Sequence, residues 1–186
     1  MASIDADKPI RGGFIRMDPL TAAVTQILPF QTDPATVSRG LVSTPTNGSP
    51  SEPREQITFT LALDATAPGA NQLGIYPMLS ALELLMYAPA GAPPLIVFVW
   101  GGRRILPIRV VELQVTEQQF DAALTPIRAQ LAVTVQVLKT ADLAAASEGR
   151  RLWDEHVTVM QTLASNLPAA TLADLGLAAL GGASTP

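Results

Sequence analysis

Apolar and polar residues alternate along most of the first 140 positions, with the two-residue period of β-strands. The clearest case is the segment ITFTLAL at 57–63. The segment LIVFVW at 95–100 is continuously apolar and lies between prolines and glycines, which is typical of a buried strand before a tight turn. The pattern predicts seven strands, at residues 14–17, 23–31, 37–42, 57–63, 95–100, 104–116 and 127–138.

Apolar residues recur at helical spacing in two other places. Residues 76–87 carry such a stripe with Pro77 in the first turn, which predicts one helix packed on the sheet. Residues 149–165 predict a second helix, and 168–180 a short amphipathic segment before a fraying end. The strands are complete by Leu138, and an isolated helix of this length is marginal in water. We therefore expect the C-terminal helix to dock on another chain.

Two polar segments interrupt the strands and predict loops. Residues 43–54 contain three prolines and almost no apolar residue, so we expect a mobile loop outside the core. Residues 117–126 are also polar, and we expect the stretch from Thr116 to Pro126 to be mobile or to contact a partner. The chain divides into a β-rich domain at 1–143 and a helix with a flexible tail at 144–186.

Composition excludes several classes of function. The net charge is −4 and only 15% of residues are charged, so the sequence has no basic footprint for nucleic acid or an anionic membrane. With no cysteine it has no disulfide framework and no thiolate site, and synthesis in the cytoplasm is expected. Prolines break the longest uncharged stretch, 84–102, and the N-terminus does not resemble a signal peptide. We expect no membrane span.

The surface has few charges to keep it solvated. Hydrophobic residues make up 48% of the chain and aromatic residues only 5%. Stable monomers usually keep large apolar patches off their surface. This composition therefore favours a subunit that buries part of its surface against neighbours.

No motif for catalysis, cofactor binding or metal binding is present. His156 is the one histidine, with Asp154 and Glu155 beside it, and no nucleophile motif G-x-S-x-G accompanies it. We interpret His156 as structural, and we expect neither an enzyme nor a cofactor. The remaining candidate carboxylates lie in different elements and form no sequence-defined pair: Asp33, Asp64, Glu83, Glu112 and Asp121. The glycine pairs Gly12–Gly13, Gly101–Gly102 and Gly181–Gly182 are interpreted as turn or tail residues.

Arginines around the second predicted hairpin are the remaining candidates for a binding site. Arg103, Arg104, Arg109 and Arg128 would form a basic patch if they shared one sheet face, but cross-strand or inter-subunit ion pairs are favoured. Trp100 ends a buried run and is expected in the core rather than at a ligand.

Several segments resemble the tube-like proteins of contractile injection systems. The segment PFQTDPATVSRGL at 29–41 resembles the one that opens this family, and the block FVWG followed by LPIRVVEL is the most specific match. Further blocks agree in order, so that the resemblance covers about residues 10–143: they are 57–66, 74–87, 93–121 and 124–138.

The resemblance implies a ring-forming structural protein. Its fold would be mainly β, a split β-barrel of the tail-tube type with one flanking helix and a C-terminal helical appendage. It would form a hexameric ring in the baseplate, connecting the inner tube to the spike or hub of a particle that assembles in the cytoplasm and can be released. Two features depart from the family: Thr32–Asp33 replaces the usual aromatic–asparagine pair, and residues 144–186 replace the peptidoglycan-binding LysM module of some members.

Two other classes of function stay open at this point. One is a small β-barrel module that binds an anionic ligand at the barrel mouth or on the arginine-bearing face. The other, an enzyme, would depend on a hydrolytic activity lost when His156 is replaced.

Overall fold

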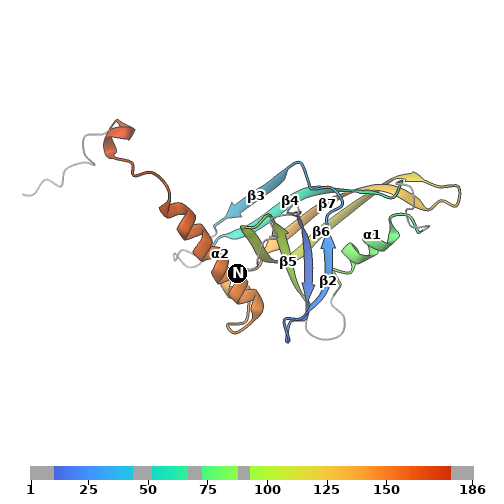
Figure 1. Cartoon of the computed structure of the whole chain (residues 1–186), viewed down its shortest axis with the longest axis horizontal. Helices are drawn as coiled ribbons and strands as arrows, with labels where there is room; N and C mark the ends of the chain where they lie inside the picture. Colours follow the sequence, from blue (N-terminus) through green and yellow to red (C-terminus); the bar gives the residue numbers. More distant parts are fainter. Residues whose placement is uncertain (1–10, 44–51, 67–72, 88–92, 177–186) are drawn as a thin grey trace, which may run out of the picture.

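The computed structural model describes residues 11–43, 52–66, 73–87 and 93–176, which contain seven strands, two α-helices and two short 3₁₀ turns (Figure 1). The strands are β1 Gly13–Met17, β2 Val24–Pro29, β3 Val37–Val42, β4 Arg54–Asp64, β5 Leu95–Trp100, β6 Arg104–Phe120 and β7 Pro126–Val137. The helices are α1 Tyr76–Glu83 and α2 Glu148–Ser165, and the 3₁₀ turns are Thr140–Asp142 and Leu172–Leu175.

All seven strands belong to one antiparallel sheet in the order β2-β1-β5-β6-β7-β4-β3. The mainly β, α+β fold class and the position of each predicted strand are therefore confirmed. β2 and β3 are the edge strands and do not pair with each other. The expected barrel is thus not closed, and the sheet stays open.

The open sheet curls strongly on itself, as the contact between Phe14 and Phe59 shows. Phe14 on β1 and Phe59 on β4 lie four strand spacings apart in the sheet, which would be about 19 Å in a flat one. Their ring centroids are 6.2 Å apart. Phe30 and Phe98 lie between them, with Phe59 and Phe98 stacked at 5.4 Å. The core therefore lies inside the curl, and Trp100 packs against it in partly buried form, as predicted.

The segment after β2 bridges the two ends of the curl. The Phe30 amide donates to the Gly12 carbonyl at 2.9 Å, and the Asp33 carboxylate accepts from the Gly12 amide at 2.8 Å. Gln31 bonds the backbone of Asp64 at the end of β4 twice, donating to its carbonyl at 3.1 Å and accepting from its amide at 2.9 Å. The Asp33 side-chain oxygen therefore holds the local turn as a hydrogen-bond acceptor.

The glycine pair Gly12–Gly13 is a packing requirement, not a turn as the sequence indicated. A β-carbon on Gly12 would lie 2.7 Å from the Trp100 ring, and one on Gly13 would lie 2.7 Å from the Leu28 carbonyl oxygen. Gly101, with φ +65°, does form the predicted turn between β5 and β6. Gly181–Gly182 lies outside the described residues.

Several predicted boundaries were wrong because strand pairing overrides local polarity. Residues 117–120 are not a loop: β6 continues to Phe120, with Glu117 paired to Ala129 of β7, and the turn is held by Asp121. β4 begins at Arg54, and α1 ends at Glu83 instead of near 87. The expected mobile loop at 43–54 falls mostly on residues 44–51, which lie outside the described residues, as does the end of the segment predicted at 168–180.

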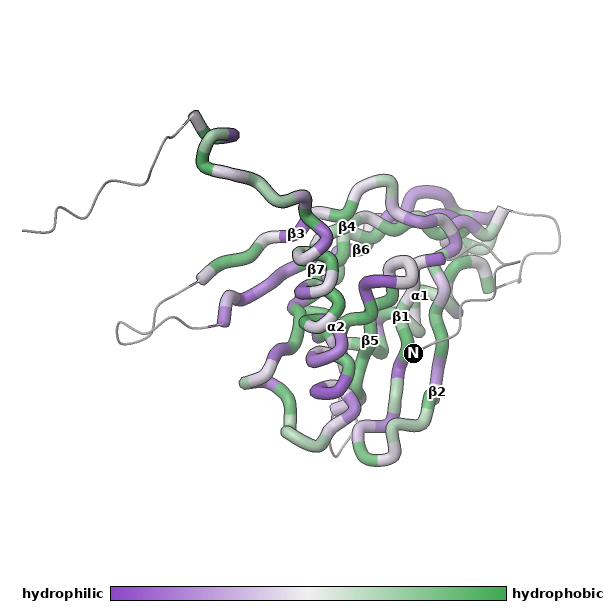
Figure 2. Tube along the Cα trace, turned by 60° about the vertical axis from the view of Figure 1, so that its left-hand side comes forward, coloured by the Kyte–Doolittle hydropathy of each residue, from purple (hydrophilic) through white to green (hydrophobic). Residues whose placement is uncertain are grey.

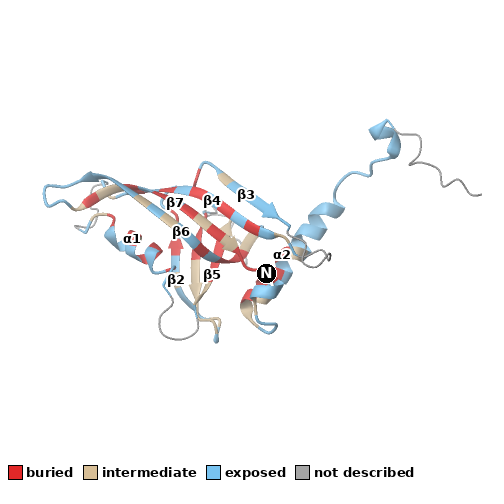
Figure 3. Ribbon diagram, turned by 180° about the vertical axis from the view of Figure 1, so that it is seen from behind, coloured by how far each residue is buried: buried red, intermediate tan, exposed pale blue. Residues whose placement is uncertain are grey.

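The first half of α2 packs on its own domain, which corrects the expectation that this helix docks on another chain. Leu152, Trp153 and His156 are buried, and Trp153 belongs to the core cluster. Ser147 caps the helix by accepting from the Arg150 amide. From Thr158 onward every described residue is exposed, and this half projects away from the sheet (Figures 1 and 3).

Replacing Gln31 with alanine tests the bridge across the open curl. The variant loses both hydrogen bonds to Asp64 in an exposed setting, so we expect the free energy of unfolding to fall by about 1 kcal/mol. Urea denaturation measures it, and hydrogen exchange at the Asp64 amide should accelerate. Gln130→Ala on the exposed side of β7 is the matched control, and equal losses in both variants would contradict the bridge.

Candidate functional site

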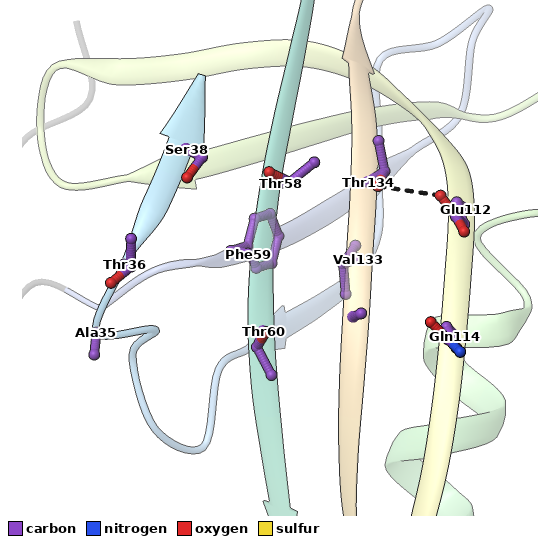
Figure 4. A pocket seen from close by; sticks show the side chains of 11 residues that line it. Ala35, Thr36, Ser38, Thr58, Phe59, Thr60, Glu112, Gln114, Val133 and Thr134 are labelled. Atoms are coloured by element: carbon purple, nitrogen blue, oxygen red, sulfur yellow. Dashed lines mark hydrogen bonds between the residues drawn. The ribbon is translucent and has the colours of Figure 1, made fainter. Parts of the chain in front are cut away.

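A shallow hollow of about 590 Å³ lies on the convex side of the sheet, across β3, β4, β7 and β6. Figure 4 shows Thr58 and Thr60 of β4 beside Thr134 of β7. These side chains come together because alternate residues of each strand face inward, so the intervening ones share the outer face. Ser38 reaches the same face from β3, since it pairs with Thr58.

Neutral polar and small side chains dominate the hollow. Glu112 is the one charged residue in its lining, and its carboxylate accepts from the Thr134 hydroxyl at 3.5 Å. Most other lining residues are small or neutral polar, among them Ala132, Gln114 and four threonines. Such a lining has no concentrated charge, and its apolar residues Phe59 and Val133 are buried, so it has little to hold an ion or a hydrophobic group.

A buried ionic cluster lies where the ends of β3, β4 and β7 meet α2. Glu55 is 2% exposed and Lys139 is 6% exposed. The Glu55 carboxylate accepts from the Arg39 guanidinium at 2.6 Å and lies 3.8 Å from the Lys139 ammonium. That ammonium donates to the Pro53 carbonyl and lies 5.1 Å from the centroid of the Trp153 ring. The cluster thus connects the helix to three strands through a carboxylate, two cations and an aromatic ring.

His156 lies beside this cluster, and neither ring nitrogen has a hydrogen-bond partner among the described residues. Its ring centroid is 5.8 Å from that of Trp153. Burial lowers its pKa, the nearby Glu55 charge partly opposes this, and the positive charges of Arg39 and Arg104 add to the lowering. The nearby Arg103 backbone raises the pKa of His156 by favouring the charged imidazolium. Among the described residues, however, no group lies in hydrogen-bond geometry with the ring.

The candidate arginines do not form one patch. Arg104 and Arg109 of β6 are an odd number of residues apart, so they point to opposite sides of the strand. Arg128 lies at the far end of the hairpin and pairs with Asp64 at 2.9 Å, which confirms an ion pair for this residue. Within the described ranges, Arg103, Arg104 and Arg109 have no ion pair.

The candidate carboxylates are likewise kept apart. Asp33, Asp64 and Asp121 each organise a local backbone turn or strand end, and hydrogen bonds lower the pKa of Asp64 and Asp121. Glu112 lies in the hollow and Glu83 is exposed on α1. In the described part of the chain no three potential metal ligands among histidine, cysteine, aspartate and glutamate come together.

Sequence reasoning missed the Glu55–Lys139 cluster. Glu55 was assigned to no element, because it lies between the expected loop at 43–54 and the strand predicted at 57–63, whereas β4 begins one residue before it. The available signal was its position: counting back from Ile57 in steps of two places Glu55 on the inward face. A carboxylate on that face needs a buried cation, and Lys139 directly after β7 was the nearest candidate.

Exposed apolar side chains occur in several places, including the two ends of the molecule. The projecting half of α2 and the residues after it expose Met160, Leu163 and Leu167, among others. At the opposite end, Phe120 and Leu124 are exposed at the tip of the β6–β7 hairpin. Figure 2 shows apolar positions along the projecting half of α2 and the residues after it. These ends are candidates for contact with other chains.

Neither a protein-family model nor a curated protein matches the chain. Within the described residues, no helix has the length and apolar character needed to cross a membrane.

The His156 site predicts a specific loss of stability in acid. Since the folded-state pKa lies below the ordinary value of 6.5, stability is complete above that value and falls as the pH drops through it. We expect the free energy of unfolding to decrease between about pH 7.5 and about pH 5.5, and to decrease less in His156→Leu. Urea denaturation across this range measures both. Parallel curves for the two proteins would show that His156 does not carry the effect.

Proposed function

We propose that this chain is a structural, ring-forming component of a contractile injection particle, an adaptor that connects the inner tube to the spike or hub. It acts as a homo-oligomer, with a hexamer as the expected ring, and has no catalytic residue. It is made in the cytoplasm and assembles into a particle that can be released. The observation that carries the proposal is the open, curled sheet with both edge strands unpaired and a long projecting hairpin.

The unpaired edges support association between copies. β2 and β3 each expose a row of backbone donors and acceptors, and an edge of this kind pairs readily with another strand. Ile27 on β2 and Leu41 and Val42 on β3 add exposed apolar side chains at the same edges. Joining the two different edges of successive copies is a heterologous contact, which closes into a ring when the rotation permits.

The low charge of the hollow on the outer face supports a role in lining a passage. The hollow across β3, β4, β7 and β6 has one charged residue, and its two large apolar lining residues, Phe59 and Val133, are buried. A surface of this kind binds passing macromolecules weakly, which suits the wall of a tube better than a specific binding site. The segment PFQTDP, the part of the resemblance that begins at Pro29, serves in this fold to hold the curl together.

The proposal is tested by the assembly state of the full chain and of edge variants. We expect light scattering and electron microscopy to show rings, alone or with the tube and spike proteins. Ile27→Lys and Leu41→Lys should reduce ring formation strongly, because a lysine on an edge opposes strand pairing.

Gln130→Lys, on the exposed face but away from either edge, is the matched control and should leave assembly intact. Circular dichroism confirms that each variant is folded. A chain that stays monomeric at all concentrations, with and without tube and spike proteins, would refute the proposed function.

A further inference from the structure

The projecting C-terminal segment is an apolar arm with no partner of its own. We define the arm as residues 159–175; its exposed large apolar side chains are Val159, Met160, Leu163, Leu167, Leu172 and Leu175. Asp174 is the one charged residue in the arm, and its carboxylate is kept ionised because hydrogen bonds from Thr171 lower its pKa. The arm therefore offers six apolar contacts and a single negative charge.

A second feature of the same chain has complementary character. An apolar cleft of about 440 Å³ lies between the end of α1, the start of β5 and the start of α2, lined by Leu85, Met86, Tyr87, Leu95 and Leu143 among others. Three charged residues also line it. Asp142 accepts from the Lys139 amide at 3.1 Å and Glu148 accepts from Arg151 at 2.8 Å, whereas Arg109 has no partner among the described residues.

The arm and the cleft thus match in polarity and in charge. Each is mainly apolar, and the single charge of the arm is opposite in sign to Arg109, the one cation in the cleft lining. Burying the leucines of the arm would remove apolar surface from water, and the pair Asp174–Arg109 would fix its register.

Within one molecule the arm and the cleft lie at opposite ends of α2. Ser147, Glu148 and Gly149 at the start of the helix line the cleft, and the arm extends beyond its far end. Eighteen helical residues span about 27 Å, and the arm leaves in the direction away from the sheet (Figure 1). A neighbouring copy can receive the arm without any rearrangement of the helix.

We infer that the apolar arm of one copy docks in the cleft of a second copy, with Asp174 paired to Arg109. The contact is heterologous, since arm and cleft are different surfaces, so each chain gives one arm and receives another. This inference rests on the proposed ring-forming function and identifies a contact, separate from the sheet edges, that would hold neighbouring copies together.

Cross-linking of single-cysteine chains tests the contact directly, because the natural chain contains no cysteine. Ala144→Cys places a thiol in the cleft lining and Ala173→Cys places one on the arm. We expect a short bismaleimide to give cross-linked dimers when the two variants are mixed. Ala132→Cys in the outer hollow is the matched partner for Ala173→Cys and should give none.

A chain carrying both Ala144→Cys and Ala173→Cys distinguishes exchange from folding back. Arm exchange gives a ladder of dimers and higher species on a denaturing gel. An internally linked monomer would show that the arm returns to its own cleft, and no linkage at either site would show that the arm does not use the cleft. Either result overturns the inference.

A charge swap tests the pair within the contact. Arg109→Asp and Asp174→Arg should each weaken association of the full chain about fivefold in sedimentation velocity, and the double variant should restore it. Both residues are exposed, so neither change threatens the fold. Single variants that associate normally, or a double variant that is no better than the singles, would overturn the pairing.

The two proposals fail in different ways. Rings that form without cross-linking between arm and cleft would refute this inference and leave the proposed function standing. Cross-linking between copies that never form rings, alone or with tube and spike proteins, would support the exchange of arms and refute the ring-forming adaptor.

Discussion

The contact between Phe14 and Phe59 is the constraint on which the rest of the fold depends. It requires a sheet whose two ends face each other, and four phenylalanine rings from both ends fill the space between them. Because the curl stops before β2 and β3 meet, the edges remain available and the gap is bridged by side chains. Gly12 is fixed by the same constraint, since a larger residue would displace the rings that close the core. The open edges are thus a consequence of how the core is packed.

The inner and outer faces of the curled sheet are built for different purposes. Inside, apolar side chains pack to exclude water, and the ions admitted there, Glu55 and Lys139, satisfy each other and hold α2 in place. Removing one of them would leave the other charge buried, so the cluster also specifies where the helix lies. Outside, threonine, glutamine and alanine cover the same strands. One alternating sequence therefore supplies both a core and a surface with little affinity for other groups.

Most of the strands could be predicted because buried and exposed positions alternate in a half-buried strand, and the residue types follow this alternation. Residues 57–63 do so without exception. The end of β6 could not be predicted, because residues 117–119 are all polar and show no alternation. Pairing of Glu117 and Gln119 with β7 holds this segment in the strand. The same holds for the candidate site. The sequence predicted a structural role for His156, but its position beside Trp153 and Glu55 depends on how α2 crosses the strand ends. Curvature also has no local signal, which is why closure of the barrel was predicted and an open curl was found.

The contrast between the buried first half and the exposed second half of α2 connects the fold to the assembly that we propose. Its first half is fixed by Trp153 in the core, and its second half continues in the same rigid element beyond the sheet. A helix anchored at one end holds its free end in a defined direction, so the docking that we propose would cost the arm less conformational entropy than it would cost a disordered tail. The buried ionic cluster that fixes the helix therefore also determines the direction of the arm. If copies associate through the arm as we propose, any change that loosens the cluster, including protonation of His156, should weaken that association before the sheet itself unfolds.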